Sequence, residues 1–145
     1  MNIRLLRNRL GRWHAEVIQA HNDAARDGVA GGMREAERRS TGGFSSRMQR
    51  LLWGAPFSKA RYGRPQLPAG IINAQTGDFY RSWSGYSVSH RGRVQNTSPY
   101  AMSLLKGTRY AFARPYDEPI ARKMEGFAFK SLSRRLDRAN SRMIS

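Results

Sequence analysis

The chain has 145 residues, a length that suits one domain, and it contains no cysteine, so disulfide bonds and thiolate metal sites are excluded. Hydrophobic residues make up 39% of it, and no apolar run approaches the ~18 residues of a membrane span, so we expect a modest core and no transmembrane segment. The 26 lysines and arginines outnumber the 10 aspartates and glutamates, and this formal net charge of +16 points to nucleic acid, an acidic protein surface or an anionic membrane as a partner.

The N-terminal segment predicts an amphipathic helix over Asn2–Asp27, ended by a group of glycines. Its apolar stripe is Ile3, Leu6, Leu10, Trp13, Val17, Ala20 and Ala24, and the glycines are Gly28, Gly31 and Gly32. Four arginines oppose the helix dipole in its first half: Arg4, Arg7, Arg9 and Arg12. A nearby acidic partner would offset that cost, and a solvated basic face is the alternative. The basic start lacks the apolar stretch of a signal peptide.

Residues 28–70 predict a loop-rich connection that contains one short helix. Ser46 and Gln49 have the spacing of a capping box, which places this helix at about Ser45–Trp53. The loop that follows interleaves basic and aromatic side chains, a mixture found both where proteins grip nucleic acid and at protein interfaces. We favour the protein interface.

Residues 71–116 predict the sheet region. Phe79 and Trp83 are its apolar anchors, and the alternation around Tyr86 and Val88 is typical of a half-buried strand that extends to His90. A turn at Arg91-Gly92 and a return strand through Val94 into Asn96 complete a hairpin.

The stretch Asn96–Pro119 predicts a strand end, one or two turns, a break at Gly107-Thr108 and a helix start framed by Pro115 and Pro119. We interpret it as a rigid docking surface, although the same residue types are also typical of a loop-rich connection in any α+β domain. The expected interface residues are Tyr100, Lys106, Arg109, Arg114 and Tyr116. Tyrosine and arginine are residues that interfaces favour.

The last segment, 117–143, predicts a C-terminal helix with acidic residues in its first turn. Its apolar stripe is Ile120, Met124, Phe127/Ala128, Leu132, Leu136, Ala139 and Met143. A basic ridge for contact with DNA or an acidic partner is formed at i, i+4 spacing by Lys130, Arg134, Arg138 and Arg142. The expected fold is α+β, with a small antiparallel sheet packed against a long N-terminal helix and this C-terminal helix.

The order of these signals resembles the HK97 gp10-like family of neck and tail-completion proteins of tailed bacteriophages. The matching residues are Thr76, Gly77, Phe79, Ser82, Tyr100, Ala101, Gly107, Thr108, Arg114, Pro115 and Tyr116. The resemblance spans about Gln75–Met124, a third of the chain. The chain departs from the family pattern at Lys106, where an acidic residue is common, and at Ala74-Gln75, which lack the usual proline.

The resemblance implies a structural virion protein that forms a ring, commonly six-fold, between the portal-side connector and the tail. Its partners would be copies of itself, a head-side connector or stopper protein, and tail-tube or terminator proteins, with genomic DNA in the lumen. The implied location is the neck or tail top of the virion, and the host cytoplasm during assembly. Neither a cofactor nor a membrane partner is implied.

Two other classes stay open at this point. The first is a small basic nuclease, in which His14 and His21, seven residues apart on one helix, would act with Glu16; a structural role for both histidines is the alternative. His90 is the third histidine, and no metal-binding carboxylate cluster or phosphate loop is apparent. The second class is a basic nucleic-acid-binding protein, for which we find no recognisable reading element.

Overall fold

A computed structural model describes residues 3–41, 78–109 and 113–144. The elements are α1 (Ile3–Thr41), α4 (Asp78–Arg81), β1 (Trp83–Val88), β2 (Arg91–Asn96), α5 (Ala101–Lys106) and α6 (Asp117–Ile144). The expected helix at 45–53, the loop that follows it and Thr76-Gly77 lie outside the described residues. The expected α+β class is confirmed: two long helices accompany one small antiparallel sheet.

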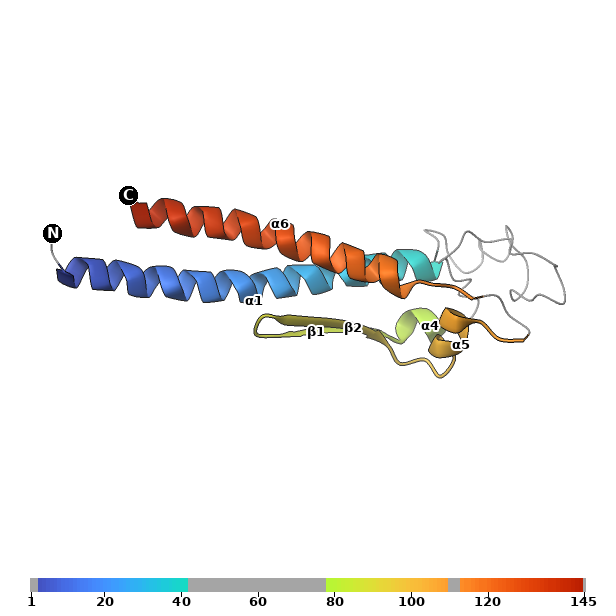
Figure 1. The fold of residues 1–145 in the computed structure, drawn as a ribbon. Coiled ribbons are helices and arrows are strands. Elements are labelled where there is room, and N and C mark those ends of the chain that lie inside the picture. The colour runs from blue at the N-terminus through green and yellow to red at the C-terminus, as the bar shows by residue number, and fades with distance from the viewer. Residues whose placement is uncertain (1–2, 42–77, 110–112, 145) are drawn as a thin grey trace.

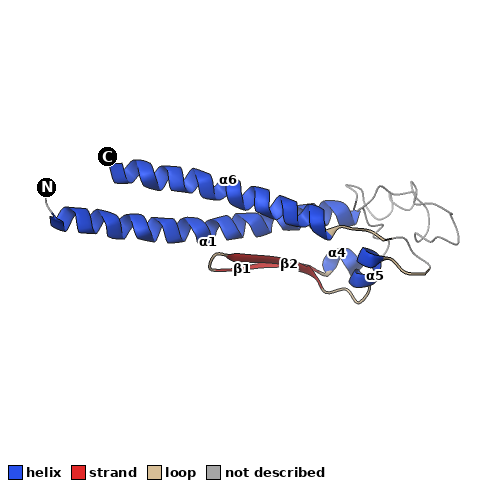
Figure 2. Cartoon of the chain, viewed as in Figure 1, coloured by secondary structure: helices blue, strands red, loops and turns tan. Residues whose placement is uncertain are grey.

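The described elements form three layers (Figure 1). Helix α1 is the middle layer, with α6 antiparallel to it on one side and the β1–β2 hairpin on the other. Helix α6 is shorter than α1 and runs back along it, so both ends of the described chain lie toward the same end of the molecule (Figures 1 and 2). The short helices α4 and α5 lie near the other end.

Helix α1 is longer than we expected, because the three glycines do not end it. It continues to Thr41, and the glycines lie where other elements approach it closely. A Cβ atom at Gly31 would lie 2.5 Å from the Phe127 ring, and one at Gly32 would lie 2.3 Å from Met124 Cγ. Glycine is therefore used here for close helix packing, and the prediction of a helix end was wrong.

The hairpin is confirmed, but its turn is formed by Ser89 and His90, so Arg91 and Gly92 belong to β2. Its buried face also differs from the prediction. Tyr86 and Val88 are exposed, at 46% and 66%, so the half-buried interpretation of these two positions was wrong.

Two glycines of the hairpin lie against α1 in place of those side chains. A Cβ atom at Gly85 would lie 2.7 Å from Val29, and one at Gly92 would lie 2.6 Å from the same residue. Because glycine has no side chain, the strands approach α1 more closely here than other residues would allow. The glycine face of the hairpin is therefore the one that packs against α1.

The core lies where α1, the hairpin, the short helices and the start of α6 meet. Its buried hydrophobic members are Ala36, Phe79, Ala101, Tyr116 and Ile120. The rings of Phe79, Trp83 and Tyr116 contact one another edge to face, with every pair of centroids 5.6 Å apart. The indole nitrogen of Trp83 donates to the buried Ser40 hydroxyl at 2.7 Å. Phe79 and Trp83 are thus anchors of this core, as the sequence predicted.

Candidate interaction surface

Beyond the tip of the hairpin, α1 and α6 continue as a pair of helices with no third layer in the described chain (Figure 1). We call this pair the two-helix arm and define it as residues 3–22 and 132–144. A hydrogen bond from Trp13 Nε1 to Asn140 Oδ1 (3.0 Å) crosses it, as does an ion pair between Arg142 and Glu16 (3.5 Å). Two helices can cover only one face of each other, so the arm keeps much of its surface open.

Large apolar side chains are exposed along the arm. They include Leu5, Leu6, Leu10, Ile18 and Ile144, of which Leu5 is 60% and Ile144 86% exposed. Leu6 and Leu10 lie on the face of α1 that also carries Trp13, by their spacing of four and three residues. A row of apolar side chains on one helix face that the described part of the chain leaves exposed is typical of an interaction surface.

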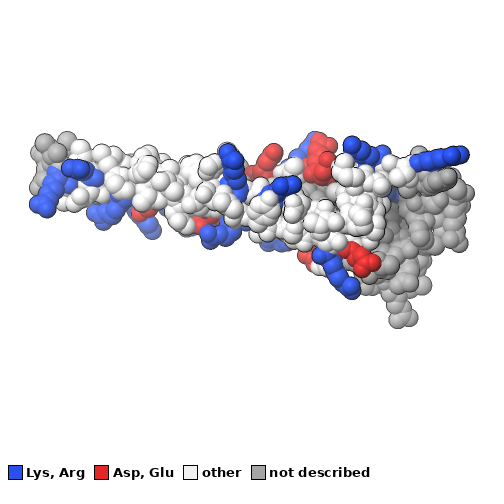
Figure 3. Space-filling view, turned by 90° about the horizontal axis from the view of Figure 1, so that it is seen from below, with Lys and Arg blue, Asp and Glu red and all other residues white. Residues whose placement is uncertain are grey.

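The arm is also strongly basic, with eight arginines and two carboxylates. The arginines are Arg4, Arg7, Arg9, Arg12, Arg134, Arg135, Arg138 and Arg142, and the carboxylates are Glu16 and Asp137. Figure 3 shows basic side chains spaced along one face of the molecule. The predicted ridge of Lys130, Arg134, Arg138 and Arg142 is exposed, as its spacing required.

A polar cluster ties α6 to α1 at the base of the arm. Arg135 donates to Asp23 at 2.9 Å, to Asp27 at 3.3 Å and to the Ser131 hydroxyl at 3.1 Å. Ser131 also donates to Asp27, and this hydrogen bond lowers the pKa of Asp27 below its ordinary value. Burial opposes this shift and raises the pKa. The hydrogen bond from Arg135 and the charges of Arg135 and Arg134 lower the pKa further. The cluster therefore holds the two helices in register through charge-assisted hydrogen bonds.

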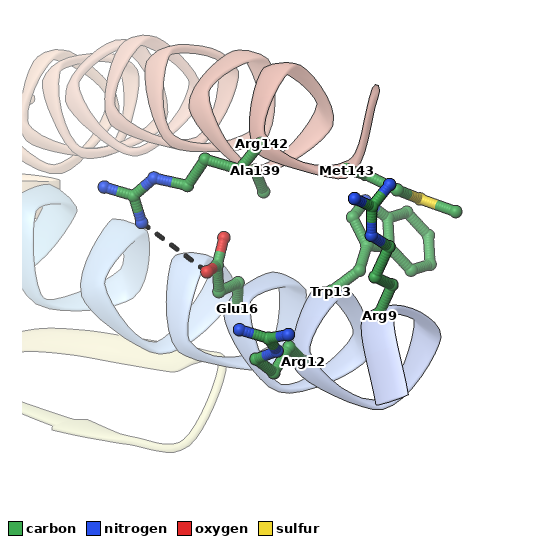
Figure 4. A pocket seen from close by; sticks show the side chains of 7 residues that line it. All are labelled: Arg9, Arg12, Trp13, Glu16, Ala139, Arg142 and Met143. Carbon is green, nitrogen blue, oxygen red and sulfur yellow. Dashed lines mark hydrogen bonds and ion pairs between the residues drawn. The ribbon is translucent and has the colours of Figure 1, made fainter. Parts of the chain in front are cut away.

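A cleft of about 380 Å³ opens between the two helices of the arm (Figure 4). Its lining residues are Arg9, Arg12, Trp13, Glu16, Ala139, Arg142 and Met143. Three of them are apolar and three are arginines. The only carboxylate among them, Glu16, is already paired with Arg142, as the dashed line in Figure 4 shows.

The expected docking residues of the 96–119 stretch separate into two groups. Tyr100, Lys106 and Arg109 are exposed, so their role in an interface stays a prediction. Tyr116 and Arg114 are 5% and 3% exposed, so the expectation that both present themselves on the surface was wrong.

The burial of these two side chains has a physical cause. The Tyr116 ring completes the aromatic cluster, and its hydroxyl donates to the carbonyl oxygen of Ala101 at 2.7 Å. The backbone nitrogen of Arg114 donates to the Leu104 carbonyl at 2.7 Å, which ties the segment to α5. Burial lowers the pKa of the Arg114 guanidinium, because desolvation disfavours its charge.

The break before α6 is confirmed. The short helix α5 stops at Lys106, and Gly107 follows with φ of 78°, a left-handed conformation that favours glycine. Helix α6 begins at Asp117 and ends at Ile144, one residue beyond the predicted end. The apolar stripe of this helix is buried or half-buried except at Phe127, which is 41% exposed.

The candidate catalytic residues of α1 do not form one site, because Glu16 lines the cleft toward α6 and the two histidines do not. His14 and His21 are exposed, and His21 Nδ1 lies 2.8 Å from the Val17 carbonyl oxygen of its own helix. Glu16 is held by Arg142, and His90 lies in the hairpin turn. In the described ranges, no three histidine, aspartate or glutamate side chains gather where they could hold a metal ion.

Sequence reasoning missed the cleft, because its two walls come from opposite ends of the chain. The opposition of Arg9 and Arg12 to the helix dipole was the one local signal that pointed to it. Among the described helices, none is long and apolar enough to cross a membrane.

The fold and surface define a small basic α+β protein with a projecting two-helix arm. In comparisons with known proteins, no family model matches the chain, and neither the curated proteins nor the solved structures gave a match.

Proposed function

We propose that this chain is a structural virion protein of a tailed phage, a neck or tail-completion ring subunit that joins the portal-connector complex to the tail. The observation that carries the proposal is the two-helix arm, whose exposed apolar and arginine side chains suit a surface that is completed only in a complex with other proteins. Exposed leucines on one face of a helix indicate that this face contacts another protein.

The resemblance to the HK97 gp10-like family supports the proposal at the level of the fold. Phe79, Ala101 and Tyr116, three residues of the shared motifs, lie together in the core, and Gly107 occupies a left-handed turn. The motif residues are thus ones that build the subunit, and their order along the chain is what a shared architecture would require. The exposed Tyr100, Lys106 and Arg109 lie nearby in sequence and are the proposed contacts between subunits.

In the proposed ring of six copies, each subunit contacts the next through two different surfaces, and the contacts close by rotation. The net charge of +16 opposes self-association of bare subunits, so a ring needs acidic surfaces or DNA to compensate it. The head-side connector or stopper and the tail-tube or terminator proteins would supply the acidic surfaces. The ridge of Lys130, Arg134, Arg138 and Arg142 would contact such a surface or DNA in the lumen.

Electron microscopy of particles carrying a labelled copy of the chain tests the proposal. We expect a monomer or small oligomer by mass photometry for the purified protein, and density for a closed ring on the tail axis in the particle. A chain that is absent from the virion, or present only away from the tail axis, would overturn the assignment.

A basic nucleic-acid-binding protein is the second candidate, because the four-residue basic ridge is exposed along α6. It predicts tight binding of the purified chain to duplex DNA, with an affinity that falls steeply as salt rises. Replacement of Arg134 and Arg138 by glutamate would abolish such binding. A particle that assembles normally with this double variant would separate DNA binding from the role in the neck.

A further inference from the structure

The cleft of the two-helix arm combines an apolar floor with a basic rim. Trp13, Ala139 and Met143 form the floor, and Arg9 and Arg12 stand beside it (Figure 4). From this combination we infer that the cleft is a docking site for an acidic polypeptide segment that also carries apolar side chains. The inference rests on the cleft alone and does not depend on a role in a phage neck.

The arginines that line the cleft outnumber its carboxylates. Arg142 is matched by Glu16 at 3.5 Å, and the described residues that line the cleft include no second carboxylate to match Arg9 or Arg12. Arg9 and Arg12 therefore bring positive charge to the cleft that its described lining does not compensate. An acidic ligand would supply the missing negative charge.

The apolar floor indicates a polypeptide in preference to nucleic acid. Trp13 is half-buried between the helices, and its Nε1 donates to Asn140. Its ring therefore forms part of the floor of the cleft and does not project into solvent, where a nucleic-acid base could stack on it. Leu6 and Leu10 extend the apolar face of α1 beyond Trp13 and are exposed. A ligand with apolar side chains at helical spacing would cover this row, whereas a sugar-phosphate backbone would leave it in water.

A second copy of this chain does not fit the same surface. The arm holds eight arginines and only two carboxylates, so two arms packed together would place arginines against arginines. The described part of the chain also shows no acidic run that could fold back onto the arm. Charge complementarity therefore selects a different, acidic protein.

Fluorescence anisotropy with the full chain and three labelled probes tests the inference at about 0.15 M salt, where weak surface charge effects are screened. The first probe is a short glutamate-rich peptide with leucines at i, i+3, i+4 and i+7. The second is the same peptide with serine in place of leucine, and the third is a short DNA duplex. We expect the leucine peptide to bind about tenfold more tightly than the serine peptide, because only the leucines cover the apolar floor.

Two variants locate the binding in the cleft. Arg9→Glu combined with Arg12→Glu should weaken binding of the leucine peptide about tenfold or more. The matched control, Arg81→Glu combined with Arg91→Glu, makes the same charge change at exposed residues of α4 and β2 and should change the affinity less than about twofold. Circular dichroism confirms that both variants keep their helices.

Met143→Gln keeps the charge of the cleft and makes part of its floor polar. It should weaken binding of the leucine peptide more than binding of the serine peptide, and so reduce the preference for the leucine peptide. Equal affinity of the wild-type chain for the two peptides would overturn the inference. So would an equal loss in the control variant, or tighter binding to the DNA duplex than to the leucine peptide.

Discussion

The Tyr116 hydroxyl donates a 2.7 Å hydrogen bond to the carbonyl oxygen of Ala101, and both residues are buried in the core. This bond ties the segment before α6 to the first turn of α5. It places the tyrosine ring against Phe79 and Trp83, with centroids 5.6 Å away from each. Tyr116 therefore connects the two halves of the 96–119 stretch from inside the core.

Tyr116→Ala should destabilise the fold by about 3–5 kcal/mol, because it removes a buried ring and leaves a cavity. Tyr116→Phe should cost only about 1 kcal/mol, the value of the lost hydrogen bond. Tyr100→Ala is the matched control, since Tyr100 is 42% exposed and should change stability by less than about 0.5 kcal/mol. Urea unfolding followed by circular dichroism measures all three, and a Tyr116→Ala chain as stable as Tyr100→Ala would contradict the core role.

Gly31→Ala should destabilise the contact between α1 and α6 by about 1–3 kcal/mol, because the new Cβ would lie 2.5 Å from the Phe127 ring and 3.0 Å from its Cβ. Gly11→Ala is the control on the same helix, where nothing lies within 4 Å. It should raise stability by up to about 1 kcal/mol through helix propensity. Thermal melting compares the two variants, and opposite signs are the expected result.

Arg135→Ala should loosen the junction of the two-helix arm, since Arg135 contacts Asp23, Asp27 and Ser131. We expect a loss of about 1 kcal/mol, reduced by screening because the arginine is 38% exposed. Arg134→Ala removes a neighbouring charge whose Nε donates to the Lys130 carbonyl of its own helix, and it should lower the melting temperature less than Arg135→Ala does. Faster amide hydrogen exchange at the 132–144 end of α6 in Arg135→Ala alone would locate the effect.

The stability of the fold should fall on acidification below about pH 4. The hydrogen bond from Ser131 lowers the pKa of Asp27, and the hydrogen bond from Arg38 lowers the pKa of Glu35. A carboxyl whose folded-state pKa is depressed adds stability above its unfolded pKa and loses it as the pH falls through the folded pKa. Urea midpoints measured at several pH values give the slope of stability against pH, and Asp27→Asn should make this slope shallower. An unchanged slope in this variant would mean that groups other than Asp27 cause the loss of stability in acid.

Plasmid DNA incubated with the chain and Mg²⁺ or Mn²⁺ should stay intact, because His14 and His21 are exposed on α1 and Glu16 is paired with Arg142. Gel electrophoresis over several hours measures this. Cleavage that disappears in His14→Ala or His21→Ala would show that the chain is a nuclease and that these histidines act in catalysis.

The sequence by itself determined the two helices that flank a hairpin, the α+β class and the basic ridge of α6, although it did not determine where α1 ends. These features depend on the spacing of apolar and charged residues along the chain, and the backbone translates that spacing directly into faces of helices and strands. For this reason the ridge is exposed, and the apolar stripe of α6 is buried or half-buried apart from Phe127.

Only the tertiary structure decided what the glycines and the aromatic residues do. Gly31 could end a helix or admit a neighbour, and the choice depends on Phe127, which is far away in the chain. Tyr116 could anchor a partner or fill a core, and the choice depends on Phe79 and Trp83. The cleft likewise required α1 and α6 to meet, because contacts between distant segments leave no periodic signal in either one.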